Sequence, residues 1–369
     1  MKILIIAPIG TKFTTGLGNA IKITKEILET NNYVYLVDIA SGLNEVDIGK
    51  FTFNRFLFFL KIFFLILIKI PKFNIIYITL SMSLGGFFRD MIFIIISKFF
   101  FKKIFIHLHG GGYKKNFFSK RGFFLKKIIT FTLNLCDKLF VLSEKFKDDF
   151  NFIDNHKKIK VLENTIKIEN IKFHRDFDKL RIIYVSNFIK SKGYDLILKT
   201  CKLLADQKID FMCEMYGKFL NIGSNKEDIS ANQLRKEFLD FIKHNKLENN
   251  ISFSENLDPK EKYKKLRNAN VFVFPSNYPG EGLPLSLLEA SANKLPIIST
   301  NHGAITDIVK VGNNGFILES LNELEIMDYL IQLTKNKELF KTMSESSFKV
   351  FNESFNYKKI KEKTLNEFK

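Results

Sequence analysis

Two glutamates, Glu281 and Glu289, stand eight positions apart in the segment NYPGEGLPLSLLEASANKLPIIST, residues 277–300. A proline and two glycines around the first glutamate break regular structure. Pro284 suits the first position of a helix, because its missing N–H needs no partner there. We therefore expect Glu281 in a loop at the mouth of a helix and Glu289 more than one turn inside that helix.

This arrangement suits an anionic ligand that carries hydroxyl groups on both sides. The N-terminus of a helix presents backbone amides that bind phosphate, and the amides near Gly282 and Leu283 would do so here. Carboxylates such as those of Glu281 and Glu289 accept hydrogen bonds from sugar hydroxyls. A diphosphate between two polyols is a nucleotide sugar, so these residues predict a site for such a compound.

The flanks of this segment, FVFPS and PIIST, read as two short strands. The spacing alone would fit a surface helix with two solvated acids. With its flanks, the segment resembles the E-x7-E segment of retaining glycosyltransferases of the GT-B fold (group 1, family 4-like), which build polysaccharides, lipopolysaccharides and glycolipids. The resemblance implies that Glu281 faces the transferred sugar and that Glu289 holds the ribose hydroxyls of the nucleotide.

Apolar strand candidates alternate with helical segments along nearly the whole chain, which predicts parallel sheets covered by helices on both faces. The candidates are ILIIAPI, YVYLVDI, NIIYITL, KIFIHLH, KLFVLS, RIIYVSN, FMCEMYG, ISFSEN, VFVFPS and PIIST. Together with the resemblance they predict an α/β chain of the GT-B fold, with two doubly wound Rossmann-like domains facing across a cleft.

The polar stretch from Glu169 to Lys179 interrupts this pattern and is the predicted domain boundary. We expect a first domain over residues 1–172 and a second over residues 178–352. The resemblance implies that the first domain binds the acceptor and the second the nucleotide sugar. It also implies that a last helix within residues 353–369 crosses back to the first domain.

Two segments of the first half carry further candidates. Gly16 and Gly18, in the loop between the first strand and the first helix, let backbone approach a ligand closely, although a simple tight turn fits them equally well. In IHLHGGGYKK we expect His107 and His109 to point to opposite faces of a strand, with His109 at its carboxyl end, where ligands gather in open α/β sheets. The resemblance implies that the glycine loop touches donor phosphate and acceptor, and that His109 lies close to the transferred sugar. His107 is expected in the core or between domains.

The segment YVSNFIKSKGYDLIL opens the second half. Lys192 resembles the phosphate-gripping lysine of the family, and a cation there would neutralise the departing diphosphate; an ordinary exposed lysine is the alternative. Many relatives have Gly-Arg where this chain has Ser186 and Asn187. Asn187 brings hydrogen bonds but no charge, so either Lys190 substitutes or donor binding is weaker. Other polar positions are interpreted as structural, namely Tyr216-Gly217, Asn164 and His302-Gly303.

The sequence predicts no metal site and no cofactor beyond the co-substrate, a UDP- or GDP-linked sugar. His107 and His109 have the i, i+2 spacing of some metal ligands, but no acidic or cysteine partner is near them in the sequence. The three cysteines, Cys136, Cys201 and Cys213, form no CxxC pair and indicate a reducing compartment. The first ten residues form one short apolar run, too short for a signal peptide. We therefore expect the chain in the cytoplasm.

Most of the net charge of +18 falls in residues 1–180, which carry +14 of it. This asymmetry predicts an anionic partner for the first half, whereas codon bias would explain only the abundance of lysine. Residues 54–70 are about as apolar as a membrane span, but a span there would separate two strands of one sheet. Polar side chains share one arc of its helical wheel, as in an interfacial helix, namely Asn54, Arg55, Lys61 and Lys69.

Residues 114–127, KKNFFSKRGFFLKK, add six basic residues, four phenylalanines and no acid. With residues 54–70 they predict a docking face for anionic lipid, unless the phenylalanines are core and the lysines merely solvated. No nucleic-acid-binding signature accompanies them, so nucleic acid is not an expected partner.

These observations predict a hexosyltransferase-type enzyme, peripheral on the inner face of the cell membrane. It would move a sugar from a nucleotide-diphosphate sugar to a glycan or polyprenyl-diphosphate-linked acceptor, in cell-surface polysaccharide or lipopolysaccharide biosynthesis. Two alternatives stay open. A sugar-nucleotide epimerase of the same fold would need no acceptor, and the missing arginine at Asn187 allows a non-catalytic, membrane-associated binding protein.

Overall fold

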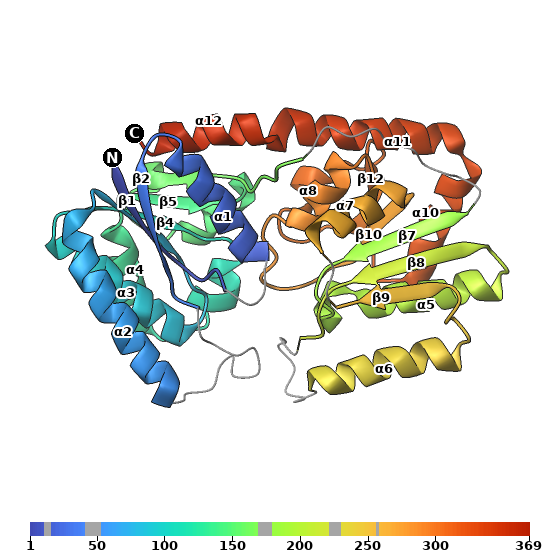
Figure 1. Ribbon diagram of the computed structural model, residues 1–369, viewed down its shortest axis with the longest axis horizontal. Coiled ribbons are helices and arrows are strands. Elements are labelled where there is room, and N and C mark those ends of the chain that lie inside the picture. The colour runs from blue at the N-terminus through green and yellow to red at the C-terminus, as the bar shows by residue number, and fades with distance from the viewer. Residues whose placement is uncertain (11–15, 41–52, 169–178, 221–229, 256–257) are drawn as a thin grey trace. The chain divides into compact units, whose positions relative to one another are not determined.

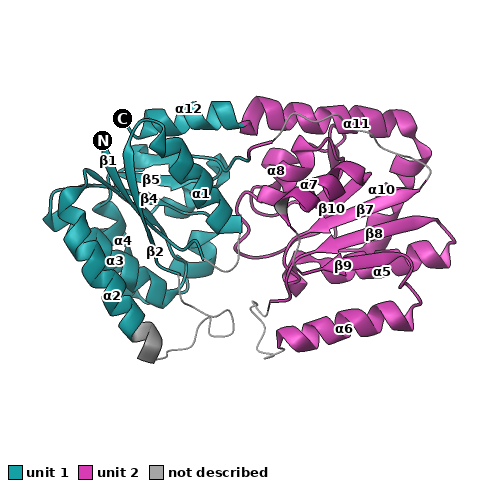
Figure 2. Cartoon of the chain, viewed as in Figure 1, with its two compact units in different colours: residues 1–166, 357–369 teal, residues 167–356 magenta. Residues whose placement is uncertain are grey.

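The computed structural model describes residues 1–10, 16–40, 53–168, 179–220, 230–255 and 258–369. The chain divides into two compact units (Figure 2). Unit 1 comprises Met1–Ile166 with Tyr357–Lys369, and unit 2 comprises Lys167–Asn356. The sequence predicts a domain boundary between Glu169 and Lys179. Of these residues only Lys179 is described by the structure.

Unit 1 is built on a parallel six-stranded sheet with the order β2-β1-β3-β4-β5-β6. The strands are β1 (Lys2–Ala7), β2 (Tyr33–Asp38), β3 (Ile75–Thr79), β4 (Lys103–His107), β5 (Lys138–Val141) and β6 (Ile159–Val161). The inner strands are unbroken apolar runs, with every residue of β3 buried. Such runs are typical of parallel strands that are covered on both faces.

Helices cover both faces of this sheet. They are α1 (Gly16–Glu29), α2 (Phe53–Lys69), α3 (Leu84–Phe99), α4 (Phe123–Asn134) and α12 (Tyr357–Glu367), with short helical turns at η2 (Ile70–Lys72), η3 (Lys114–Phe118), η4 (Glu144–Phe150) and η5 (His156–Lys158). Figure 1 shows α2, α3 and α4 side by side on one face. On the other face α1 packs with α12.

The last residues of the sequence pack in the core of unit 1. The ring of Phe368 is buried, with centroids 5.1 Å from Phe105 and 5.7 Å from Phe140. Two ion pairs flank this contact, Lys138–Glu367 at 2.8 Å and Lys363–Glu163 at 2.7 Å. Aromatic packing supplies most of the attachment, because partly exposed ion pairs contribute little.

Unit 2 repeats the architecture with a parallel sheet of order β12-β11-β10-β7-β8-β9. Its strands are β7 (Leu180–Val185), β8 (Phe211–Tyr216), β9 (Ile251–Ser254), β10 (Val271–Phe274), β11 (Ile297–Thr300) and β12 (Gly315–Leu318). Its helices are α5 (Tyr194–Asp206), α6 (Ala231–His244), α7 (Pro259–Asn268), α8 (Leu285–Ala292), α9 (Ile305–Ile308), α10 (Glu323–Lys335) and α11 (Lys337–Val350), with turns at η6 (Lys190–Lys192) and η7 (Phe351–Phe355). The order of each sheet reverses direction once, and ligands of open α/β sheets bind at the carboxyl ends of strands near such a reversal.

All ten strands predicted from the sequence are present, and the prediction of two parallel, doubly wound sheets is confirmed. Strands β6 and β12 were not predicted, and each is one of the two edge strands of its sheet. Both are short, with three and four residues. Lys160 interrupts β6 and Gly315 opens β12, so neither shows an unbroken apolar run.

Candidate functional site

The loop between β10 and α8 carries the first of the two glutamates. Pro284 is the N-cap of α8 and not its first helical residue, and the helix runs over Leu285–Ala292. Glu281 lies in the loop ahead of the helix and Glu289 in its second turn, as the spacing predicts. Because β10 and β7 are neighbours in the parallel sheet, this loop emerges at the same edge as the loop after β7.

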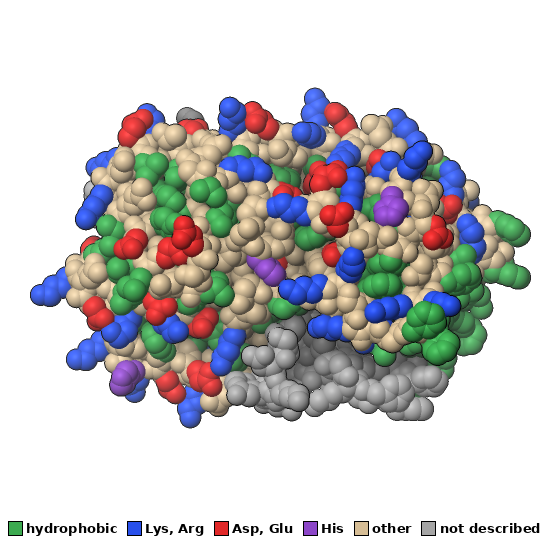
Figure 3. Space-filling view, turned by 180° about the vertical axis from the view of Figure 1, so that it is seen from behind, with side chains coloured by type: hydrophobic (Ala, Val, Ile, Leu, Met, Phe, Trp, Pro, Cys, Tyr) green, Lys and Arg blue, Asp and Glu red, His purple; other side chains and the backbone are tan. Residues whose placement is uncertain are grey.

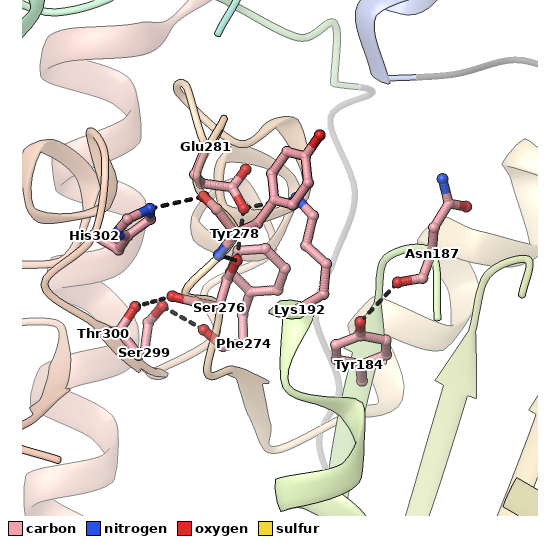
Figure 4. A network of polar contacts seen from close by, with 10 residues as sticks. All are labelled: Tyr184, Asn187, Lys192, Phe274, Ser276, Tyr278, Glu281, Ser299, Thr300 and His302. Atoms are coloured by element: carbon pink, nitrogen blue, oxygen red, sulfur yellow. Dashed lines mark hydrogen bonds and ion pairs between the residues drawn. The ribbon is translucent and has the colours of Figure 1, made fainter. Parts of the chain in front are cut away.

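The Glu281 carboxylate is buried but has two partners. Its Oε2 accepts a hydrogen bond from Lys192 Nζ at 2.6 Å and another from Ser276 Oγ at 2.7 Å (Figure 4). The side chain of Glu281 is 6% exposed and that of Lys192 is 14% exposed. Two residues singled out separately in the sequence are therefore in direct contact, which was not predicted.

The Lys192 ammonium also lies beside two aromatic rings. Its Nζ is 4.7 Å from the centroid of Tyr278 and 5.4 Å from that of Phe274. Gly193 follows at φ +78°, where a Cβ would meet the carbonyl oxygen of Pro275 at 2.3 Å. The lysine is thus held between the loops after β7 and β10 by charge, ring contacts and a turn that requires glycine.

The turn before α9 holds the same loop from its other side. His302 Nε2 is 2.7 Å from the Tyr278 carbonyl oxygen. Gly303 has φ +56°, and a Cβ there would lie 2.4 Å from the carbonyl oxygen of Glu281. The interpretation of His302-Gly303 as a turn before a helix agrees with this geometry, which also shows that the turn supports the glutamate loop.

Burial and then the nearby Glu281 carboxylate raise the pKa of Tyr278.

Asn187 lies apart from the lysine–glutamate pair. Its carbonyl oxygen accepts a hydrogen bond from Tyr184 at 3.1 Å, and its Oδ1 accepts one from the Lys218 amide at 3.3 Å. Figure 4 shows the side-chain amide pointing away from Lys192 and Glu281. Lys190, the possible substitute for the missing arginine, forms a loose ion pair with Glu237 at 3.8 Å.

Glu289 has a lysine partner of its own. Its Oε1 is 2.5 Å from Nζ of Lys262, which projects from helix α7. Both side chains are mostly buried. The sequence analysis did not single out Lys262, because α7 has four lysines in PKEKYKKLRN and nothing local distinguishes one of them.

In unit 1 the histidine pair differs from its prediction. The rings of His107 and His109 lie 4.0 Å apart, so the expectation that they point to opposite faces was wrong. Residues two positions apart in extended backbone share a face. Tyr77 Oη lies 2.6 Å from His107 Nδ1 and 3.4 Å from His109 Nε2.

The histidine pair is neutral at physiological pH. Burial lowers the pKa of His109 to about 4, an effect that a hydrogen bond with Asn164 opposes. The pKa of His107 is lowered as well, first by burial and then by the charge of His109. Asn164, interpreted as structural from the sequence, is thus a direct neighbour of His109.

The two glycines of the first loop lie in the opening turn of α1, not ahead of it. Gly18 is buried, whereas a Cβ on Gly16 would meet nothing within 4 Å. The preceding residues 11–15 of that loop lie outside the described part of the chain. Among the described residues, no three His, Cys, Asp or Glu side chains gather in a way that could hold a metal ion.

Comparison with protein families gives a match over residues 167–350 to the family "Glycosyl transferases group 1". The chain belongs to this family. The match spans β7 to α11 and includes the loops that carry Lys192, Glu281 and Glu289. It confirms the family that the resemblance indicated.

Two curated relatives of this chain are informative. An uncharacterized glycosyltransferase of Methanocaldococcus jannaschii is 28% identical over 278 residues, which are 70% of this chain and 66% of the relative. The poly(ribitol-phosphate) alpha-N-acetylglucosaminyltransferase of Staphylococcus aureus is 25% identical over 255 residues, 68% of this chain and 48% of the relative. The chain therefore spans less than two thirds of the length of either.

Among solved structures, HepE of Anabaena in complex with UDP resembles this chain with a TM-score of 0.72. The alignment covers 100% of this chain and 99% of that one at 13% sequence identity. At this identity the likeness establishes the fold. The GT-B prediction is confirmed.

Proposed function

We propose that the chain is a retaining glycosyltransferase that takes a sugar from a nucleoside-diphosphate sugar. The observation that carries the proposal is the Lys192–Glu281 pair at 2.6 Å, positioned ahead of the N-terminus of α8. A cation, a carboxylate and helix amides then lie at one edge of the sheet in unit 2. Those three groups match the diphosphate and the sugar of the donor.

Each group has a role in the proposed reaction. The ammonium of Lys192 has three N–H donors and gives one to Glu281, which leaves others for the diphosphate. The amides near Gly282 and Leu283 bind the same diphosphate, and Glu281 binds the transferred sugar. Glu289 accepts hydrogen bonds from the ribose hydroxyls. Asn187 can add a hydrogen bond but no charge to the donor site, and its side-chain amide must turn towards Lys192 to do so.

In a retaining transfer the acceptor hydroxyl attacks the anomeric carbon from the face that the leaving group departs from. Negative charge grows on the departing diphosphate, and Lys192 with the helix amides stabilises it, the role that a metal ion fills in other transferases. An oxygen of the diphosphate takes the proton of the acceptor hydroxyl. On unit 1 the proposed contacts with donor phosphate and acceptor are Gly16 and Gly18. His109 is the proposed contact with the transferred sugar, because a neutral imidazole suits hydrogen bonding to a sugar hydroxyl.

The donor is proposed to be a UDP-sugar, with a GDP-sugar as the competing choice. Binding of UDP by HepE supports the uridine nucleotide. The proposed acceptor is a glycan or a polyprenyl-diphosphate-linked glycan of a cell-surface polymer. The named activity of the S. aureus relative on poly(ribitol-phosphate) supports a polymer of that class.

Unit 1 is proposed to dock on the inner face of the cell membrane through helices α2, α3 and α4. Within the described ranges no helix is both long and apolar enough to span a bilayer. All three helices nevertheless expose large apolar side chains, the most exposed of which are Phe64, Ile68, Phe99, Phe123, Phe124 and Phe131. Figure 3 shows hydrophobic side chains gathered at the right-hand edge of the view with Lys and Arg beside them.

The segment 114–127 supports this docking in part. Phe117 is buried in the core, but Phe123 and Phe124 are 65% and 80% exposed. Lys127 is exposed and lies 4.4 Å from the Phe123 ring centroid. On α2, Lys61 is exposed among apolar neighbours, while the side chains of Asn54 and Arg55 lie outside the described residues. Exposed aromatics beside lysines suit an anionic lipid surface.

The test is a donor screen with radiolabelled UDP- and GDP-sugars on membranes that contain lipid-linked acceptors. We expect one donor to give labelled, acceptor-dependent glycan. Incubation with donor alone separates transfer from epimerisation, because an epimerase changes the sugar without an acceptor. Conversion of the donor without transfer, or binding with no turnover of any donor, would contradict the proposal.

A further inference from the structure

Helix α7 is strongly basic, and two of its lysines are paired with carboxylates. Lys262 Nζ lies 2.5 Å from Glu289 Oε1 on α8. Lys265, three residues on, lies 2.6 Å from Glu214 Oε1 on β8. The two pairs attach one helix to two different elements, but only the first touches the E-x7-E segment.

The two pairs also differ in their surroundings. The side chains of Lys262 and Glu289 are 18% and 9% exposed, whereas Lys265 is 34% exposed. The same Glu214 oxygen also accepts a hydrogen bond from Tyr216 Oη at 3.0 Å, so Glu214 has a second partner. For the Glu289 carboxylate, the described contacts include Lys262 alone.

We propose that Lys262 is a positioning residue for the nucleotide, a role that rests on the proposed function. The ammonium offsets the cost of burying the Glu289 carboxylate and fixes its orientation. A carboxylate has about four lone-pair sites, so Oε1 can accept from Lys262 and from a hydroxyl at the same time. The two neighbouring hydroxyls of a ribose then bind Oε1 and Oε2 together. Without Lys262, the Glu289 carboxylate would lose the contact that orients it towards the two hydroxyls.

The test measures the affinity of UDP and of 2′-deoxy-UDP by calorimetry for the full chain and its variants. In Lys262→Met we expect the Kd of UDP to rise about tenfold, the cost of about one charge-assisted hydrogen bond. The Kd of 2′-deoxy-UDP should rise less than threefold, since one of the two hydroxyls is already absent. Lys262→Arg should restore most of the affinity. In a Glu289→Gln background, Lys262→Met should add little further loss.

Lys265→Met is the matched control, because it removes the other ion pair of the same helix and leaves Glu289 untouched. We expect its Kd values to stay within twofold of the wild type. Equal losses in Lys262→Met and Lys265→Met, or equal losses for both nucleotides, would reduce Lys262 to an anchor of α7 and overturn the inference. A wild-type chain that binds neither UDP nor GDP would instead overturn the proposed function itself.

Discussion

The two units bury polar groups in opposite ways. In unit 2, Glu281 and Lys192 are buried as opposite charges in contact, so each offsets the cost of burying the other. In unit 1, His107 and Tyr77 are buried and His109 is half-buried, no described residue places a counter-charge beside them, and burial lowers the pKa of both histidines. Under the proposed function, the charged edge of unit 2 suits a diphosphate, and the neutral cluster of unit 1 suits an uncharged sugar hydroxyl.

The largest effect is expected from removing the charge in unit 2. Lys192→Met should lower the rate of sugar transfer by about a hundred- to a thousandfold, because the departing diphosphate loses its cation. It also leaves Glu281 buried without its partner, so the free energy of unfolding should fall by about 2–4 kcal/mol. Transfer assays and urea denaturation measure the two effects.

Lys202→Met is the control for this change. Lys202 pairs with Asp206 at 2.5 Å on the surface of α5, and both side chains are about half exposed. Its loss should leave the transfer rate unchanged and shift the stability by less than about 0.5 kcal/mol. A Lys192→Met enzyme that keeps half of its activity would show that unit 2 does not use this charge.

The next largest effect is expected on membrane binding, which the proposal assigns to unit 1 and not to unit 2. Replacing Phe123 and Phe124 together by serine should weaken binding to vesicles of anionic phospholipid about tenfold, because two exposed rings no longer insert. Leu324→Ser, at an exposed position of unit 2, should leave binding unchanged. Sedimentation with vesicles measures both variants. Equal binding by the wild type and the double variant would contradict the docking proposal.

The smallest expected effect concerns the neutral cluster. The pKa of His109 is about 4 in the fold and 6.5 in its absence, so the unfolded chain binds the proton more tightly. The free energy of unfolding should therefore fall as the pH is lowered from 6.5 towards 4. Between pH 7 and pH 5, the free energy of unfolding should decrease by about 1 kcal/mol less in His109→Gln than in the wild type. This figure allows for the partial exposure of His109. Urea denaturation at pH 7 and pH 5 measures the difference, and NMR titration of His109 near pH 6.5 would contradict it.

Much of the fold could be predicted from the sequence because parallel strands buried on both faces are unbroken apolar runs. The run LIIAPI in β1 and FVFPS in β10 are examples. The strands β6 and β12 were not predicted, because Lys160 interrupts the first and Gly315 opens the second directly after two asparagines. Pro284 is the N-cap of α8 and not its first helical residue, a difference that depends on local backbone angles.

The candidate site was harder to predict, because its contacts are long-range. Lys192 and Glu281 are separated by 89 positions, and each was found through its own motif while their contact was not. Lys262 and Glu289 belong to different helices, and only the packing of α7 beside α8 selects that lysine. The prediction that His107 and His109 point to opposite faces was wrong for a different reason. Residues two positions apart in a strand share a face, so their spacing in the sequence already indicates the observed contact.

The most direct test of the account is a crystal structure of the chain with UDP bound. We expect the diphosphate in hydrogen-bond contact with Lys192 Nζ and with amides at Gly282 and Leu283, and the ribose hydroxyls on the carboxylate of Glu289. A diphosphate bound elsewhere, with Lys192 still turned wholly to Glu281, would contradict the central claim that unit 2 binds the donor through these groups.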